Sequence, residues 1–507
     1  MADQRPTAAR LPLSIRSGTA VAAGALLASS LPPRGWWPLG VAGIGLLGAT
    51  LRDVTARCRF LLGALAGATL LTVGLWWATG LHFGGGIVLI ACQGLLFGLI
   101  GPLVNPVRPW TALTGAVVLV EALRWRWPLS GLPFASPVLG QVDAPWVAIA
   151  PLAGSLGVLL VTAAVGGALA AGLAAGRGKA ITMAAFSLAL TPFVLSGPWP
   201  VSVENGRADV VRVAIVQGGG PTGTSAATGD PAVPLRRALA LSADIPEETD
   251  LVVWAENVIQ VSFPFEDSDV AASLGVLAAE NHTTMLVGVT ENDDALGEVP
   301  RFRNAAVVVE GDGQVGDRYE KVIRVPFGEY VPLRDLLARV VDLSRVPRDA
   351  IVGEGPPTVQ TSLGTIGTVI SFEAMFPQRV RAAVSAGGQF LVVPTNASSY
   401  VGPDVPAQQL AGARLRAMET GRAIAQAAPT GYSAIIDPDG TVRRLSQLGS
   451  GEVLTGEVMK RTALTPFVRF GDGPTLLAAS VFVGVAWAPT AYSRWSRSRS
   501  MYSISLD

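Results

Sequence analysis

Cysteine, histidine and charge are all scarce in this chain. Its 507 residues include two cysteines, Cys58 and Cys92, and two histidines, His82 and His282. So few cysteines cannot build a disulfide framework, and no group of cysteines and histidines has the spacing of a zinc site. Charged residues make up 15% of the chain, against about 25% in an ordinary soluble protein. With 38 basic and 38 acidic residues, the chain is neither a basic nucleic-acid binder nor a disordered polypeptide.

Apolar residues are what the chain has in excess. Hydrophobic residues are 50% of the sequence and the mean hydropathy is +0.44, which indicates that part of the chain lies in a bilayer. Spans are expected at about 18–32, 36–51, 60–80, 86–104, 110–124, 146–173, 180–197 and 474–490. The first, second and fifth runs are short and fit buried bundle helices as well, which leaves the count of seven before residue 200 open by about one.

The basic residues predict an orientation for these segments. If the N-terminus is cytoplasmic, nine basic residues fall on the inner side of the first seven runs and three on the outer side. The inner set is Arg5, Arg10, Arg16, Arg52, Arg57, Arg59, Arg108, Arg177 and Lys179, and the outer set is Arg34, Arg124 and Arg126. This excess follows the positive-inside rule. A cleaved signal peptide is the alternative for the first run, but six apolar runs and no clear cleavage motif follow it.

The same topology predicts on which side of the membrane the rest of the chain lies. Seven crossings place the segment after residue 200 on the outer side, and Arg494, Arg497 and Arg499 place the C-terminal tail inside. The expected domains are a membrane domain at 1–200, an outer domain at 204–470, a last span at 474–490 and a cytoplasmic tail at 491–507.

The outer domain changes to short β-branched strands alternating with helices. Strands are expected at 210–217, 250–256, 283–290, 304–310, 365–371, 389–396 and 432–437, and helices at 233–243, 268–280, 377–387 and 405–421. This alternation predicts a sheet covered by helices. Gly218–Asp230, rich in glycine, threonine and serine, is expected to be a mobile loop. It lacks the G-x-x-x-x-G-K-[ST] pattern of a phosphate-binding loop.

Several apolar strands of this domain end in polar residues. Glu256 ends one strand and Asn396 ends another. Ser371 ends a third, with Glu373 just after it, and Lys321 stands in the segment RYEK. In open α/β sheets such strand ends carry the site. A carboxylate can serve as a general base, an ammonium can stabilise an oxyanion and a hydroxyl can be a nucleophile. Taken singly, each has a plain alternative as a strand-end side chain satisfied by solvent or a cap.

A Ser-His-Asp hydrolase is the competing chemistry for this domain. Its one histidine, His282, lies in ENHTT before an apolar strand, and the sequence has no G-x-S-x-G elbow. A structural or surface role fits His282 better than a catalytic one.

Longer blocks of the sequence match a known family. They are VAIVQG (213–218), LVVWAEN (251–257), RYEKVIRVPFGEYVPLRDLL (318–337), VISFEAMFP (369–377), VVPTN (392–396), ARLRAMETGRAIAQAAPTG (413–431) and IDPDG (436–440). With these blocks and its order of segments, the chain resembles the apolipoprotein N-acyltransferases of bacterial cytoplasmic membranes. The resemblance implies a polytopic α-helical membrane domain of about eight spans. It also implies a nitrilase-like α/β domain, an α-β-β-α sandwich, on the outer face.

The resemblance also implies a reaction. The family moves an acyl chain from a phospholipid to the α-amino group of the diacylglyceryl-modified N-terminal cysteine of an apolipoprotein. It does so through a thioester on its own cysteine, with no metal, cofactor or nucleic acid. Matched by position, Glu256 is the general base and Lys321 the oxyanion-stabilising lysine. Glu329 and Glu373 are supporting carboxylates, and the nucleophilic cysteine falls on Ser371.

The site motifs depart from the family at several positions besides Ser371. The family's C-Y-E is S-F-E here, so that Phe372 lacks a phenol. The W-P-E motif has Ala255 in place of proline, and P-T-N-D-x-W continues after Asn396 as Ala397-Ser398-Ser399. The N-T-G motif has Pro429 in place of asparagine. A tryptophan expected in the loop after VAIVQG is missing.

These departures leave three functions open. The chain is an acyltransferase that uses Ser371, or a catalytically silent paralogue that binds lipid, lipoprotein or a protein partner in the membrane, or an amidase acting on a soluble amide. Serine is a much weaker acid than cysteine and needs a base of suitable pKa. A transporter is disfavoured because the spans lack charges away from their ends, with Glu121 the one acidic residue of interest there.

Overall fold

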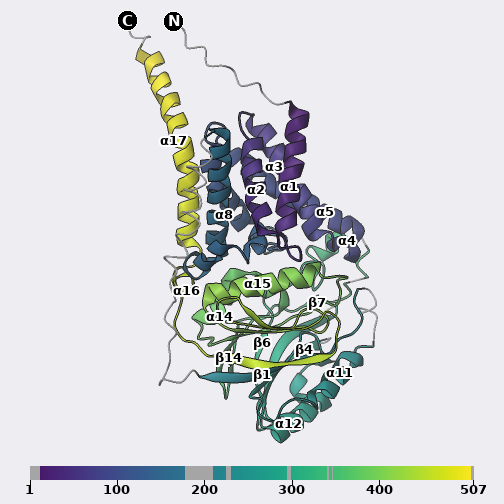
Figure 1. Ribbon diagram of the computed structural model, residues 1–507. Helices are drawn as coiled ribbons and strands as arrows, with labels where there is room; N and C mark the ends of the chain where they lie inside the picture. Colours follow the sequence, from purple (N-terminus) through teal and green to yellow (C-terminus); the bar gives the residue numbers. More distant parts are fainter. Residues whose placement is uncertain are drawn as a thin grey trace.

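The computed structural model describes residues 12–176, 209–223, 230–293, 299–339, 342–344 and 346–503. The described chain forms a helical part stacked on an α/β part, and the long helix α17 (Gly473–Ser503) runs from the α/β part along the helical part (Figure 1). Helix α1 (Leu13–Ser30) begins, and α17 ends, at the side of the helical part that is turned away from the α/β part (Figure 1).

The helical part follows the predicted apolar runs closely. After α1 come α2 (Trp37–Thr50), α3 (Ala56–Leu75), α4 (Ala78–Leu81), α5 (Phe83–Gly98), α6 (Ile100–Leu103), α7 (Pro109–Arg124) and α8 (Ala150–Ala174), with 3₁₀ turns η1 (Pro137–Gln141) and η2 (Pro145–Ile149) before α8. The predicted span at 180–197 lies outside the described residues. Three described segments are long and apolar enough to cross a membrane, namely Ala56–Leu75, Phe83–Leu103 and Pro145–Ala174. Trp37–Thr50 and Gly473–Ala488 are apolar but shorter. The total of eight spans therefore stays a prediction.

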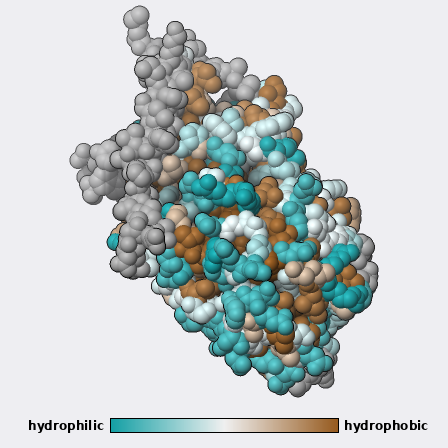
Figure 2. Space-filling model, turned by 60° about the horizontal axis from the view of Figure 1, so that its bottom comes forward, coloured by the Kyte–Doolittle hydropathy of each residue, from teal (hydrophilic) through white to brown (hydrophobic). Residues whose placement is uncertain are grey.

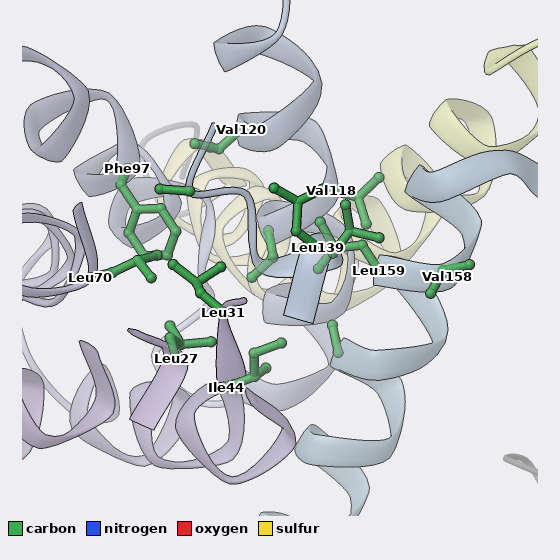
Figure 3. Close-up of a cluster of buried hydrophobic side chains, with 14 of the residues drawn as sticks. Leu27, Leu31, Ile44, Leu70, Phe97, Val118, Val120, Leu139, Val158 and Leu159 are labelled. Atoms are coloured by element: carbon green, nitrogen blue, oxygen red, sulfur yellow. The ribbon is translucent and has the colours of Figure 1, made fainter. Parts of the chain in front are cut away.

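Leucine, valine and phenylalanine side chains from several helices fill the centre of the helical part (Figure 3). Small residues let these helices approach closely. At Gly115 on α7, a Cβ atom would lie 2.0 Å from the carbonyl oxygen of Ala479 on α17, so any larger residue would push the two helices apart. Gly154 has φ 67° and breaks α8 near its start, a conformation that favours glycine.

The α/β part contains two stacked sheets. The first has the order β14-β1-β2-β4-β5-β6 and the second β13-β12-β11-β10-β9-β8. The strands of the first are β1 (Val210–Gln217), β2 (Leu251–Trp254), β4 (Thr284–Asp293), β5 (Arg301–Val309), β6 (Val315–Glu320) and β14 (Glu452–Met459), with β3 (Ile259–Ser262) and β7 (Asp349–Ala350) at its margin. Those of the second are β8 (Thr358–Thr361), β9 (Gly364–Thr368), β10 (Leu391–Pro394), β11 (Ile424–Ala427), β12 (Ala434–Ile436) and β13 (Val442–Leu445).

Helices cover both outer faces of the sheet pair. Helices α11 (Ala232–Ser242) and α12 (Asp269–Asn281) pack on the first sheet, and α14 (Pro377–Ser385) and α15 (Asp404–Thr420) on the second (Figure 1). The predicted α-β-β-α sandwich is confirmed. Its surface turned away from the helical part carries many hydrophilic side chains (Figure 2). The short helices η4 (Phe265–Asp267), α13 (Arg334–Leu337), η5 (Ser371–Met375) and α16 (Pro466–Phe470) complete the described elements.

The sequence prediction was wrong at two kinds of places. The strand expected to end at Ser371 ends at Thr368, because the chain turns into η5, whose first residue is Ser371. Strands β3, β6, β7, β8, β11, β13 and β14 were not predicted. Several of these, such as β6 and β13, are short or largely polar, so that they show no continuous apolar run.

Helix α15 joins the two parts of the molecule. Fourteen of its 17 residues are buried. Ala413 and Ala417 pack with the second sheet, whereas Leu415 and Met418 belong to the hydrophobic cluster of the helical part. At its end, Glu419 accepts a hydrogen bond of 2.6 Å from the backbone nitrogen of Ser155, next to the break in α8. The two parts therefore share one continuous interface.

Candidate active site

Lys321 lies between two carboxylates. It follows β6, and its Nζ donates to Oε1 of Glu256 at 2.8 Å and to Oε1 of Glu329 at 2.7 Å. Glu256 follows β2 of the same sheet, and Glu329 lies in the PFGEY block. The side chains of Lys321 and Glu256 are 3% and 4% exposed, so this ion pair is almost fully withdrawn from water. An ammonium has three N–H donors, and the third is left for another acceptor.

Asn304, at the fourth position of β5, binds both carboxylates and was missed by the sequence analysis. Its Nδ2 donates to Oε1 of Glu256 at 2.8 Å and to Oε1 of Glu329 at 3.1 Å. The predicted strand 304–310 begins with this residue, and an amide at the start of an apolar run is the one weak sequence signal that it offers. Asn304 and Lys321 together hold the two carboxylates at a fixed separation.

Burial and charge shift the pKa values of this group. Burial raises the pKa of Glu256, and the charge of Glu329 adds to that rise, while Lys321 opposes it in part. Burial lowers the pKa of Lys321, but the charges of Glu256 and Glu329 outweigh it, so the net shift is upward and the lysine stays protonated. A carboxylate with a raised pKa next to a fixed cation is suited to accept and return a proton.

Ser371 occupies a strained position at the start of η5. Its φ is 53°, a left-handed conformation that is uncommon for a residue with a side chain. Glu373 supports this turn, because its Oε2 accepts from the backbone nitrogen of Ile370 at 2.9 Å. Its Oε1 accepts from the backbone nitrogens of Val322 and Ile323, both at 2.9 Å. Glu373 therefore ties the turn that carries Ser371 to the segment that follows Lys321.

The hydroxyl of Ser371 forms no direct hydrogen bond with the carboxylate of Glu256, and Asn396 contacts both residues. Within the described residues, Ser371 Oγ accepts from Thr395 Oγ1 at 3.1 Å and from the backbone nitrogen of Asn396 at 3.5 Å. Asn396 Nδ2 donates to the backbone oxygen of Glu256 at 3.4 Å, which links the two sides. Hydrogen bonds in this part of the chain engage Oε1 of Glu256 and leave Oε2 unengaged.

Aromatic rings extend the site toward the helical part. Phe372 stacks on Phe134 with centroids 6.1 Å apart, and Phe134 contacts Trp77 at 5.5 Å. Trp77 in turn meets Tyr400 edge-on at 4.9 Å. Burial raises the pKa of Tyr400 to about 12, with smaller influences from Lys321 and the two carboxylates. Trp77 and Phe134 come from the helical part, so this part forms one wall beside Ser371.

The other sequence candidates lie away from this site or have structural partners. His282 is the left-handed C-cap of α12, with φ 48°, so it belongs to a helix end and not to a Ser-His-Asp site. Glu121 forms a buried ion pair with Arg124 at 2.7 Å. Of the predicted loop 218–230, residues 224–229 lie outside the described chain, and Gly219 donates from its backbone to Pro429 at 2.8 Å. Among the described residues, no group of three or more histidine, cysteine or acidic side chains could hold a metal ion.

Each of the two parts of this chain matches a known family model. The carbon-nitrogen hydrolase family matches residues 212–466, and the apolipoprotein N-acyltransferase N-terminal domain matches residues 23–168. An apolipoprotein N-acyltransferase of Pseudomonas putida is 29% identical over 500 residues, covering 92% of this chain and 95% of that protein. One of Mycolicibacterium smegmatis is 29% identical over 516 residues, covering 92% of this chain and 83% of that protein.

Two solved structures of the nitrilase type each match about half of this chain. Nit3 of Saccharomyces cerevisiae, a member of branch 10 of the nitrilase superfamily, shares 20% identity and a TM-score of 0.38 over 49% of this chain and 90% of its own. A variant of the amidase from Nesterenkonia sp. AN1 shares 20% identity and a TM-score of 0.39 over 54% of this chain and 97% of its own. The carbon-nitrogen hydrolase match extends over half of the sequence. The chain therefore belongs to the carbon-nitrogen hydrolase family, in the branch that carries an apolipoprotein N-acyltransferase N-terminal domain.

Proposed function

We propose that this protein is an apolipoprotein N-acyltransferase that uses Ser371 as its nucleophile. It moves an acyl chain from a phospholipid to the N-terminal diacylglyceryl-cysteine of an apolipoprotein. The observation that carries the proposal is the buried Glu256–Lys321–Glu329 group, placed across from a strained Ser371 in a chain whose relatives over 92% of its length are acyltransferases of this kind. A chain that had lost catalysis would be under no constraint to keep a buried charged group that is costly to desolvate.

In the first half-reaction Ser371 attacks the ester carbonyl of the phospholipid. Glu256 takes the hydroxyl proton through its unengaged Oε2, and the Oγ–acyl bond forms. Lys321 offers its third N–H to the oxyanion, which is the strongest single contribution such a site makes. The ester C–O bond then breaks, and the departing lysophospholipid oxygen takes the proton back from Glu256.

In the second half-reaction the α-amino group of the apolipoprotein attacks the acyl-serine. Glu256 removes a proton from the amine, an amide bond forms, and Ser371 Oγ leaves and regains its proton. An oxyester is less reactive toward amines than a thioester, so this step is the one that the change from cysteine to serine slows most. Glu329 and Glu373 position Lys321 and the turn of Ser371, Asn396 links the two sides of the site, and Phe372 forms part of its aromatic wall.

The helical part supplies the lipid substrate in this proposal. We place seven spans before the α/β domain and one after it, with both termini in the cytoplasm and the domain on the outer face of a bacterial inner membrane. The three long apolar helices and the excess of inner basic residues support that arrangement. A wall of the site built from Trp77 and Phe134 puts the nucleophile beside the membrane domain, where an acyl chain can reach it.

Complementation of an acyltransferase-deficient strain tests the proposal. The natural chain and the Ser371→Cys variant are each expected to restore lipoprotein acylation, with the cysteine variant faster, whereas Ser371→Ala is inactive. Incubation with phospholipid is expected to add one acyl chain to the peptide that contains Ser371, as seen by mass spectrometry. If the natural chain and Ser371→Ala behave alike in both assays, the protein is a silent paralogue. Release of ammonia from small amides would support the amidase instead.

A further inference from the structure

Thr395 lies directly beside the nucleophile and has no role in the mechanism above. It follows β10, which pairs in parallel with β9, the strand before Ser371. Its backbone nitrogen donates to Ala427 at 2.7 Å, and the residue is 2% exposed. Its hydroxyl donates to Ser371 Oγ at 3.1 Å. The strand pairing therefore fixes the position of a second buried hydroxyl against the reacting oxygen.

Two donors converge on Ser371 Oγ. Besides the Thr395 hydroxyl, the backbone nitrogen of Asn396 approaches it at 3.5 Å. A hydroxyl oxygen has two lone pairs and one proton, so two donors occupy its acceptor sites and leave its own proton free to point elsewhere. That proton can then be directed toward Glu256, whose Oε2 is unengaged among the described side chains.

This arrangement suits an oxygen nucleophile better than a sulfur one. Sulfur is a weak hydrogen-bond acceptor, and a thiolate forms without such help at moderate pH. A serine oxygen becomes strongly basic twice in the cycle, once as it loses its proton and once as it leaves the acyl-enzyme. Hydrogen bonds to a charged oxygen are about twice as strong as those to a neutral one, so a fixed donor stabilises both of these states.

We propose that Thr395 is a catalytic residue, whose hydroxyl stabilises the charge on Ser371 Oγ during acylation and during transfer to the amine. The inference rests on the proposed function. In acylation the proton of Ser371 passes to Glu256, Oγ bonds to the acyl carbon, and the ester C–O bond breaks as the lysophospholipid oxygen takes that proton. In transfer Glu256 accepts a proton from the amine, the amide bond forms, the Oγ–acyl bond breaks, and Glu256 gives the proton to Oγ. Thr395 keeps its own proton throughout and donates it as a hydrogen bond.

The test compares Thr395 variants in the serine and cysteine backgrounds. The full chain is purified and reconstituted with phosphatidylethanolamine as acyl donor and a synthetic diacylglyceryl-lipopeptide as acceptor. The two rates measured are formation of the acyl-enzyme and its loss when the lipopeptide is added. With Ser371 present, Thr395→Val is expected to lower both rates by about 10- to 100-fold, the effect of one hydrogen bond to a charged atom. In the Ser371→Cys background the same change is expected to cost less than about threefold.

Two further variants separate catalysis from folding. Thr395→Ser keeps the hydroxyl and is expected to stay within about threefold of the natural chain. Thr368→Val is the matched control, because Thr368 is a buried threonine at the end of the neighbouring strand β9 whose hydroxyl has no partner among the described residues. It is expected to leave both rates unchanged.

The measured rates distinguish failure of the role of Thr395 from failure of the proposed function. A Thr395→Val chain as fast as the natural one, or equally slowed in both backgrounds, overturns the role of Thr395 while leaving the proposed function intact. If the Ser371→Cys variant is inactive, the role of Thr395 is tested by comparing Thr395→Ser with Thr395→Val in the serine background. Equal losses of rate in these two variants overturn the inference. Absence of any turnover that depends on Ser371 overturns the proposed function and this inference together.

Discussion

Replacing Lys321 with methionine removes the cation between two buried carboxylates. Methionine has a similar length, so the perturbation is chiefly electrostatic. Glu256 and Glu329 would remain joined through Asn304 but would face each other without a countercharge. Breaking a buried ion pair by removing one partner costs about 3–5 kcal/mol. The variant should therefore be destabilised by about that amount at pH 8, and its acyl transfer should fall by about 100- to 1,000-fold because the oxyanion donor is lost.

The sign of the pH dependence follows from the direction of the pKa shifts. The pKa of Glu256 is already raised by burial, and loss of Lys321 raises it further. A carboxyl group with a raised pKa in the folded state binds its proton more tightly there than in the unfolded chain, so stability falls as pH rises through the shifted pKa. The upward pKa shift of Lys321 contributes stability that is fully present below its unfolded pKa of about 10 and is lost only above it. It therefore adds no pH dependence of stability between pH 5 and pH 8. Between pH 8 and pH 5 the variant should thus regain stability relative to the natural chain.

Thermal unfolding of detergent-solubilised protein, followed by intrinsic tryptophan fluorescence, measures this effect. Lys460→Met is the matched control, because Lys460 pairs at 3.0 Å with Asp209, whose side chain is 58% exposed. Such a surface pair contributes about 0–1 kcal/mol. At pH 8 we expect the unfolding temperature of Lys321→Met to lie far below that of Lys460→Met. At pH 5 we expect the two unfolding temperatures to be close. Equal midpoints at pH 8, or a gap that widens toward pH 5, would refute the electrostatic reasoning.

Three other predictions address the supporting residues. Glu373→Gln should cost about 1–3 kcal/mol and slow acyl transfer, because an amide cannot accept from all the donors around that carboxylate; an unchanged unfolding midpoint would contradict this. Arg124→Leu should cost about 3–5 kcal/mol by leaving Glu121 buried and unpaired, and adding Glu121→Leu should recover most of the loss in the same unfolding assay. The kcat/KM of the natural chain should rise with pH through the raised pKa of Glu256, since the base must be deprotonated. Asn304→Leu should move that rise to higher pH by removing a hydrogen bond that lowers this pKa, and a move to lower pH would be inconsistent with Glu256 as the base.

The sequence predicted the architecture well because its signals are local. Strand β1 was predicted with its bounds as observed, since VVRVAIVQ is a nearly continuous apolar run. The family motifs pointed to Glu256, Lys321 and Glu329, which the structure joins by hydrogen bonds. Asn304 was missed, since a single amide in an apolar strand carries no motif.

The contacts across the two parts of the molecule were beyond sequence reasoning. Phe134 and Phe372 are more than two hundred positions apart, and nothing in either segment indicates that their rings stack. The partners of Ser371 were equally hidden, because the parallel pairing of β9 with β10 brings Thr395 next to it. Such contacts depend on the three-dimensional path of the chain and leave no periodic pattern.

Because α15 is buried on both of its faces, the α/β domain and the helical part depend on each other for stability. A helix on the outside of a four-layer sandwich ordinarily keeps one face in water, so that such a domain can be cut from its neighbours and remain soluble. Here Leu415 and Met418 on the side opposite the sheet are part of the same hydrophobic cluster as the bundle. An excised α/β domain would expose that face and aggregate. Biochemistry on this protein therefore requires the intact chain in a lipid or detergent environment, and unfolding of the bundle should carry α15 and the turn of Ser371 with it.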